Sequence, residues 1–256
     1  MPGFSRYVAI GDSQTEGLWD GDDTAGLRGF ADRLAEIVDT HYPGLSYANL
    51  AVRGRRIRDL LDDQLPTALA MQPDLVTVCI GMNDVTRPGP YFDDALAELE
   101  DLYAQLSASG ATVVTTTFPD IAQIIPIGRL LAARVLRINA EIRRAADWYD
   151  FKLVDLYHAH SMTDPETWSA DRVHGSPRGH ALFAAAAAEA LNLPGSNHDW
   201  ADAGNSPVRQ TLRSKAYSQA LWTQNMLMPW LWRHVRGRSE GDGRGPRRPR
   251  LESVAA

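Results

Sequence analysis

Two short motifs near opposite ends of the chain combine the residue types that serine hydrolysis requires. Ser13 lies in the motif GDSQTEG (residues 11–17), directly after an apolar run at residues 7–10. Asp171 precedes His174 by three residues in the motif DRVH. A histidine can take the proton of a serine hydroxyl, and a carboxylate on the second ring nitrogen orients that histidine. We therefore expect Ser13 to be a nucleophile, His174 its base and Asp171 the residue that orients the base.

Acyl transfer also needs hydrogen-bond donors for the negative oxygen that develops in its transition state. Three candidates follow predicted strands: the backbone N–H of Ser13, the backbone N–H of Gly54 and the side-chain amide of Asn83. Glycine suits position 54 because a backbone that approaches a ligand closely or takes a positive φ leaves no room for a side chain. We expect these three groups to form an oxyanion hole.

Each of these residues also has a structural alternative. Ser13 and Glu16 fit a helix capping box, Gly54 fits an ordinary turn, and Asn83 could bond to its own loop. Four arginines flank Gly54, and a solvated helix face explains them better than a site for anionic substrates does: Arg53, Arg55, Arg56 and Arg58.

His158 and His160 lie near Asp155 and Asp164, which raises the alternative of a metal site. A third convincing ligand is missing from the sequence, so surface histidines are the better interpretation. We expect neither a metal nor another cofactor. His180 lies in a predicted helix after the DRVH motif and is not expected to be the base.

Apolar runs that are typical of strands alternate with amphipathic stretches that are typical of helices. Strands are predicted near 6–10, 45–51, 74–80, 111–118 and 151–155, and helices near 26–41, 56–64, 91–109, 129–148 and 177–191. Several strands are almost continuously apolar, as in parallel sheets that are covered on both faces. The alternation predicts an α/β protein, a three-layer α/β/α sandwich with a central five-stranded parallel sheet.

Ligand sites in such folds gather beyond the carboxyl ends of the strands. Ser13 follows the first predicted strand, Gly54 the second and Asn83 the third. The segment from Asp171 to His174 lies on the long loop after the fifth strand. Four segments that are far apart in the sequence should therefore meet at one edge of the sheet.

These blocks resemble the four sequence blocks of the SGNH hydrolases, the GDSL-type esterases and lipases. The matching segments are GDS at 11–13, NLAVRG at 49–54, GMND at 81–84 and DRVH at 171–174, in the family's order and within residues 7–191. The resemblance implies a flavodoxin-like fold and metal-free ester hydrolysis. It implies the same triad and the same oxyanion hole as the residues suggest. The G-x-S-x-G elbow of the α/β-hydrolases is absent around Ser13.

Substrate choice should depend on the loops at the strand ends. The segment 118–127 is strongly apolar for a loop, and Phe118 and Ile121 would either line an acyl pocket or cover the core. Trp168, three residues before Asp171, could wall that pocket, stack on a sugar or serve a structural role.

The C-terminal quarter differs in composition from the rest. We expect a catalytic domain at 1–195, a Trp- and Met-rich helical extension at 196–236, and a basic, disordered tail at 237–256. Within residues 233–256, seven arginines against three acidic residues make the end of the chain basic, whereas the whole chain carries a formal net charge of −6. Residues 207–236 could dock on the body, mediate self-association or make peripheral membrane contact.

Composition restricts the remaining choices. The 256 residues contain one cysteine, Cys79, so a disulfide within the chain is excluded. No run of 18 apolar residues occurs, and the N-terminal residues lead directly into the first strand. We therefore expect a cytoplasmic protein without a signal peptide. From the triad we expect a small acyl ester as its substrate, and we expect no nucleic-acid partner.

The sequence thus predicts a serine esterase that hydrolyses short- to medium-chain carboxylic esters through an acyl-enzyme. A carbohydrate O-deacetylase or an acyltransferase would use the same triad. A non-catalytic ligand-binding α/β module is the alternative from a different class, but the glycine-rich phosphate-binding motifs that it needs are missing after the first strand.

Overall fold

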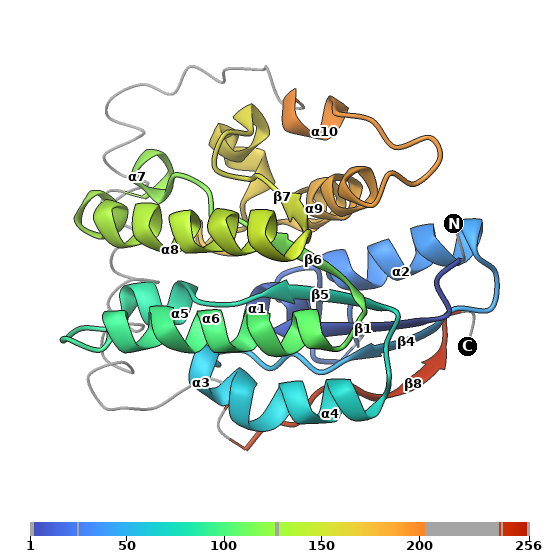
Figure 1. Ribbon diagram of the computed structural model, residues 1–256. Coiled ribbons are helices and arrows are strands. Elements are labelled where there is room, and N and C mark those ends of the chain that lie inside the picture. Colours follow the sequence, from blue (N-terminus) through green and yellow to red (C-terminus); the bar gives the residue numbers. More distant parts are fainter. Residues whose placement is uncertain (1–2, 25, 126–127, 203–240, 242, 255–256) are drawn as a thin grey trace.

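The computed structural model describes residues 3–24, 26–125, 128–202, 241 and 243–254. Its central sheet has six strands in the order β7-β6-β5-β1-β4-β8 (Figure 1). Every residue of the central strand β5 is buried, as its continuous apolar sequence predicts. The strands of this sheet are β1 (Arg6–Gly11), β4 (Ser46–Asn49), β5 (Leu75–Cys79), β6 (Thr112–Thr116), β7 (Lys152–Val154) and β8 (Arg248–Ser253).

The connections between the parallel strands explain the three layers. The first crossover leads from β1 outward to β4, and the next leads back past β1 to β5. Because both crossovers are right-handed, they place their helices on opposite faces of the sheet. α2 packs on α9 in one layer, and α6 packs on α8 in the other. The predicted α/β/α sandwich is confirmed, and its five parallel strands follow the flavodoxin-like order.

The helices lie close to their predicted positions. The segment predicted as one helix at 56–64 is interrupted by a π-helical turn at Leu60–Gln64, and Pro66 follows in the first turn of the next helix. Short elements near the strand ends were not predicted, among them the hairpin of β2 (Gly21–Asp22) and β3 (Gly26–Leu27). The α-helices are α1 (Ser13–Glu16), α2 (Phe30–His41), α3 (Ile57–Asp59), α4 (Leu65–Ala70), α5 (Met82–Thr86), α6 (Phe92–Ala108), α7 (Ile121–Ile124), α8 (Gly128–Tyr149), α9 (Pro177–Ala190) and α10 (Asp199–Asp202); 3₁₀ turns span His160–Thr163 and Pro165–Thr167.

The sheet has one strand more than the sequence predicts. β8 pairs antiparallel with β4, so part of the tail expected to be disordered at 237–256 is an ordered edge strand. The sequence of β8 does not alternate apolar and polar residues, because this edge strand is held by backbone hydrogen bonds to β4 and does not bury one face. Leu251 and Val254 pack against the core, and the guanidinium of Arg248 lies 5.2 Å from the ring centre of Tyr47.

The expected domain boundary at 195 is also wrong for the described residues that follow it. Trp200 in α10 is buried in the same core as the catalytic-domain helices, and β8 completes their sheet. Proline and glycine at 194–195 mark a turn rather than the end of the core. The segment 207–236, with its expected docking, self-association or membrane contact, lies outside the described residues.

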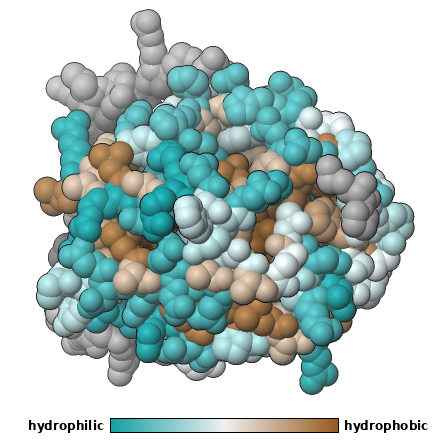
Figure 2. Space-filling view, viewed as in Figure 1, coloured by the Kyte–Doolittle hydropathy of each residue, from teal (hydrophilic) through white to brown (hydrophobic). Residues whose placement is uncertain are grey.

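The helices of the described residues do not meet the requirements for crossing a bilayer. None of the helices in the described ranges combines the length and the hydrophobicity that a membrane crossing requires. On the face viewed in Figure 2, hydrophilic side chains predominate and hydrophobic ones form separate patches. Such scattered patches are ordinary on globular proteins.

His180 joins three segments inside the fold. Its Nδ1 accepts a hydrogen bond from the N–H of Phe30 at 3.1 Å, so the ring proton resides on Nε2, which donates to the carbonyl of Leu18 at 3.1 Å. Complete burial lowers the pKa of His180 to about 4. His180 is therefore a neutral core residue that ties α9 to the start of α2 and to the loop after α1.

This burial predicts a specific pH dependence of stability. Between about pH 6.5 and pH 4, the histidine of the unfolded chain takes up a proton that the folded chain does not bind. The free energy of unfolding should therefore fall by about 3 kcal/mol as the pH decreases through this window. Urea unfolding of wild type and His180→Gln at pH 7 and pH 4.5 isolates this contribution, because glutamine can still donate to Leu18 but does not titrate. Equal losses of stability in both proteins would contradict the assignment.

Candidate active site

The structure brings Ser13, His174 and Asp171 into one chain of hydrogen bonds. Nε2 of His174 lies 2.7 Å from Oγ of Ser13, and Nδ1 of His174 lies 2.7 Å from Oδ2 of Asp171. An ionised carboxylate only accepts, so Nδ1 carries the proton of the neutral ring. Nε2 then accepts from the serine hydroxyl. This is the arrangement in which a histidine can remove the serine proton.

The second oxygen of Asp171 is held by its own loop. Oδ1 accepts hydrogen bonds from Ser169 Oγ at 2.7 Å, from the N–H of Val173 at 2.8 Å and from the N–H of His174 at 2.9 Å. Burial raises the pKa of the Asp171 carboxyl, but the hydrogen bond and charge of His174 and the two backbone donors outweigh it. The pKa therefore lies well below its usual range, and Asp171 stays ionised beside the imidazole.

Trp19 is a contact of this site that the sequence analysis missed. Its indole Nε1 donates to Oδ2 of Asp171 at 2.6 Å, on the same oxygen that accepts from His174. The side chain is 42% exposed, and the residue takes a φ of 73°, which is uncommon outside glycine. The contact joins residues 152 positions apart, so nothing in the local sequence indicates it.

The nucleophile segment is fixed at both of its ends. Asp12, not Ser13, caps α1, because the Asp12 carboxylate accepts from the N–H of Gln14. The capping-box alternative for Ser13 is therefore wrong, and its hydroxyl is free to face His174. Before it, the side-chain amide of Gln64 makes two 2.9 Å hydrogen bonds to the backbone of Gly11. Gln64 belongs to the π-helical turn, which places this amide beside the end of β1.

Two of the expected oxyanion donors are backbone groups with unused hydrogens. Neither the N–H of Ser13 nor that of Gly54 bonds to another residue in the described part of the chain. Gly54 takes a φ of 77°, the left-handed conformation that glycine adopts without strain. The choice of glycine at this position is therefore explained by its backbone conformation.

Asn83 is placed at the same edge, at the start of α5, with its amide already oriented. Its Nδ2 donates to the carbonyl of Arg55 at 2.9 Å and to Oδ2 of Asp12 at 3.2 Å. Burial raises the pKa of Asp12 to about 6. An oxyanion that accepts from this amide would have to share the hydrogen that Asn83 donates to Asp12, or take its place as the acceptor of that longer hydrogen bond.

Arg53 differs from the solvated arginine that the sequence analysis favoured. It is buried, and its guanidinium contacts Glu16 at 2.8 Å and Asp23 at 3.0 Å. Its backbone N–H also donates to Glu16 Oε2 at 2.7 Å. The residue before Gly54 is thus bound to the last residue of α1, the helix that begins with Ser13. Arg55, Arg56 and Arg58 remain partly or fully exposed, as expected.

The three residues proposed for substrate binding are buried in the core: Phe118, Ile121 and Trp168. The indole N–H of Trp168 donates to the carbonyl of Met162 at 2.8 Å, and its ring packs on Phe183. The backbone of Phe118 makes two 2.8 Å hydrogen bonds to buried Asn139. These contacts support the structural alternative for Trp168 and for the part of the 118–127 segment that is described.

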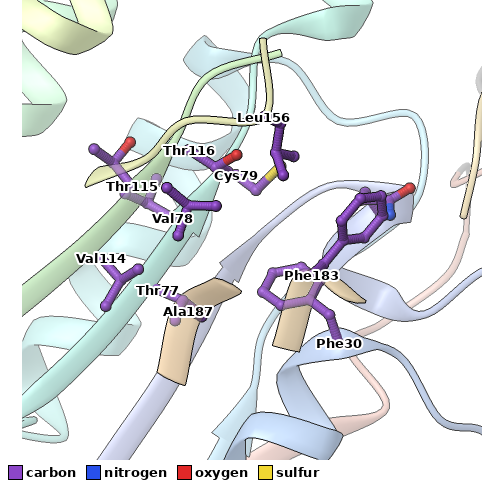
Figure 3. Close-up of a pocket in the computed structure, with 12 residues that line it drawn as sticks. Phe30, Thr77, Val78, Cys79, Val114, Thr115, Thr116, Leu156, Phe183 and Ala187 are labelled. Atoms are coloured by element: carbon purple, nitrogen blue, oxygen red, sulfur yellow. The ribbon is translucent and has the colours of Figure 1, made fainter. Parts of the chain in front are cut away.

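A small cavity of about 30 Å³ lies behind the nucleophile segment. Val78 and Val114 of the sheet line one side, and Phe30 and Phe183 line the other (Figure 3). Gln14 also lines it. Its Oε1 accepts from the N–H of Gly175 at 3.2 Å, while its buried Nε2 has no hydrogen-bond partner among the described residues. The cavity has room for about one or two water molecules. It is too small for an acyl chain, so a chain would have to lie elsewhere.

His158, one of the two histidines considered for metal binding, pairs with a neighbouring carboxylate. Nδ1 of His158 lies 2.8 Å from Asp155, which also pairs with Arg143. Among the described residues, no three His, Cys, Asp or Glu side chains are grouped so that they could hold a metal ion.

Comparisons with known proteins identify the family and the fold. Residues 9–182 match the model of the GDSL-like lipase/acylhydrolase family. LAE5, an α/β hydrolase enzyme from the metagenome of Lake Arreo, Spain, is 24% identical and has a TM-score of 0.63, covering 75% of this chain and 97% of its own. The acetylxylan esterase Axe2 of Geobacillus stearothermophilus is 21% identical with a TM-score of 0.60, covering 77% and 95%.

A search of curated protein sequences finds no match. The family match nevertheless extends over well more than half of the chain and includes all four blocks at the edge of the sheet. The chain belongs to the GDSL-like lipase/acylhydrolase family and is a serine ester hydrolase.

Proposed function

We propose that this enzyme hydrolyses short- to medium-chain carboxylic esters through an acyl-enzyme formed on Ser13. The observation that carries the proposal is the continuous contact from Ser13 through His174 to Asp171, with 2.7 Å at each step. A serine hydroxyl alone is a weak nucleophile, and this contact gives it a base and gives the base an orienting carboxylate.

In the acylation step, Oγ of Ser13 attacks the ester carbonyl carbon while its proton passes to Nε2 of His174. The carbonyl π electrons move onto the oxygen, which becomes the oxyanion. Asp171 stabilises the imidazolium without taking its proton. When the intermediate collapses, the bond to the alcohol breaks and His174 protonates the leaving oxygen. A water molecule then repeats the sequence on the acyl-enzyme and releases the acid.

The oxyanion would be bound by the N–H groups of Ser13 and Gly54 and by the amide of Asn83. The two backbone groups are held on rigid segments at the strand ends, so they need little reorganisation during the reaction. Asn83 would transfer one hydrogen bond from Asp12 to the oxyanion as negative charge develops.

Deacetylation of acetylated sugars is a second candidate, favoured by the likeness to an acetylxylan esterase. Catalytic mutants of that esterase replace a serine, an aspartate and a histidine, and its aspartate and histidine are three positions apart, as Asp171 and His174 are. The same triad would act on a small acyl group in both candidates. They differ in the alcohol that leaves.

Replacing the nucleophile tests the proposal. Ser13→Ala should lower kcat for p-nitrophenyl esters by about 10³-fold or more, because both steps need Oγ. The assay should run from acetate to palmitate, with wild type beside the variant and circular dichroism as the control for folding. Turnover that is highest on acetate and present on acetylated xylo-oligosaccharides would favour the deacetylase. Undiminished turnover by Ser13→Ala would contradict the proposal.

Trp19 should act as a positioning residue for the triad. Trp19→Phe keeps an aromatic ring but removes the hydrogen bond to Asp171, so kcat/KM should fall about tenfold, equivalent to roughly 1.4 kcal/mol. The acid limb of the pH profile should also move to higher pH, because a carboxylate with one donor fewer holds the imidazolium more tightly. Trp148→Phe, at a 78% exposed position on α8, is the matched control. A profile like that of the control would rule out this role.

A further inference from the structure

Residues beyond the family match lie directly against Arg53, in the loop of residues 50–56 that carries Gly54 and is here called the oxyanion loop. The family match ends at residue 182. Residue 241 and residues 243–247, here called the C-terminal strap, come just before β8, the edge strand that pairs with β4. Gly241 in this strap is buried and packs against Arg53. The strap is therefore an addition to the shared part of the fold that reaches its functional edge.

Gly241 contacts the peptide that joins Arg53 to Gly54, and the N–H of this peptide is one of the expected oxyanion donors. The carbonyl of Arg53 and the N–H of Gly54 belong to one planar peptide, so neither can rotate without the other. A Cβ added to Gly241 would overlap the carbonyl oxygen of Arg53. Gly241 therefore lies directly against that carbonyl, on the peptide unit that also sets the direction of the Gly54 N–H.

Ion pairs hold the strap and the oxyanion loop together. Asp23 bridges them, with Arg53 at 3.0 Å and Arg244 at 2.8 Å. Arg247 of the strap donates from Nε to the carbonyl of Glu16 at 3.0 Å and pairs with Asp32. Glu16 in turn accepts from the backbone and the guanidinium of Arg53. The same network thus reaches α1, which carries the nucleophile.

We propose that the C-terminal strap positions the oxyanion hole, with Gly241 and Arg244 fixing the Arg53–Gly54 peptide so that its N–H points at the oxyanion. The inference rests on the proposed function, because it gives the Gly54 N–H its role as a donor. Neither strap residue touches the reacting atoms. Both act through Arg53, so their loss should weaken binding of the tetrahedral intermediate more than binding of the ester.

Glycine-to-alanine substitutions in the strap separate this role from general packing. A Cβ at Gly241 would overlap the Arg53 carbonyl oxygen, so either that peptide or the strap has to shift, and the contact between them changes. A Cβ at Gly245 meets nothing within 4 Å, and Gly245 does not have a left-handed backbone. Gly245→Ala is therefore the matched control. With the best p-nitrophenyl ester of the wild type, Gly241→Ala should lower kcat by about 10- to 100-fold, since losing a donor outright costs about 10²–10³. KM should stay within about twofold.

Inhibition by a trifluoromethyl ketone distinguishes a weaker oxyanion hole from a folding defect. Ser13 Oγ adds to its carbonyl carbon, the oxygen becomes an oxyanion, and His174 takes the proton, so its inhibition constant reports the strength of the oxyanion hole. For Gly241→Ala this constant, measured on enzyme quantified by active-site titration, should rise by the same factor as kcat falls. Gly245→Ala should match wild type in both values.

A second variant keeps the test decisive if Gly241→Ala does not fold. Arg244→Gln removes the ion pair with Asp23 at an exposed position, and we expect kcat to fall about threefold with an equal rise in the inhibition constant. Unchanged constants in every folded variant would overturn the role of the strap. Failure of the proposed function looks different: the wild type itself would then neither hydrolyse the esters nor bind the ketone.

Discussion

The carboxyl ends of five parallel strands meet at one edge of the sheet, and the site depends on this constraint more than on any one contact. Ser13 and His174 are 161 positions apart in the sequence, yet their side chains bond because β1 and β7 end on the same side. The strand order reverses at β1, so the helices beside it leave toward opposite faces. The reactive groups thus lie at the opening that this reversal creates, on backbone that a buried core holds in place.

The polar groups at this edge form hydrogen bonds and ion pairs with side chains that have further partners of their own. Asp171 has donors on both oxygens, and the buried Arg53 has Glu16 and Asp23. A buried charge without such partners would cost several kcal/mol, so each of these charged groups depends on the partners that the fold provides. In return, the groups that face the substrate are already oriented before it binds, which is the main source of electrostatic catalysis.

The sequence predicts the parts of this structure that depend on local pattern. Apolar runs identify the five parallel strands, and the spacing of Ser13, Gly54 and Asn83 after them identifies the edge where they meet. Contacts between distant polar residues leave no such pattern. The indole of Trp19 and the guanidinium of Arg53 look like ordinary surface groups until the fold pairs them. β8 escaped prediction because backbone pairing at an edge, and not an apolar face, makes it a strand.

The central claim is that Ser13 becomes acylated with the help of His174, and covalent labelling tests it most directly. The wild type, Ser13→Ala and His174→Ala should be treated with a fluorophosphonate, digested and mapped by mass spectrometry. The account predicts one phosphonate on the peptide that contains Ser13 in the wild type, none in Ser13→Ala and much slower labelling in His174→Ala. Labelling of a different serine, or equal rates with and without His174, would contradict it.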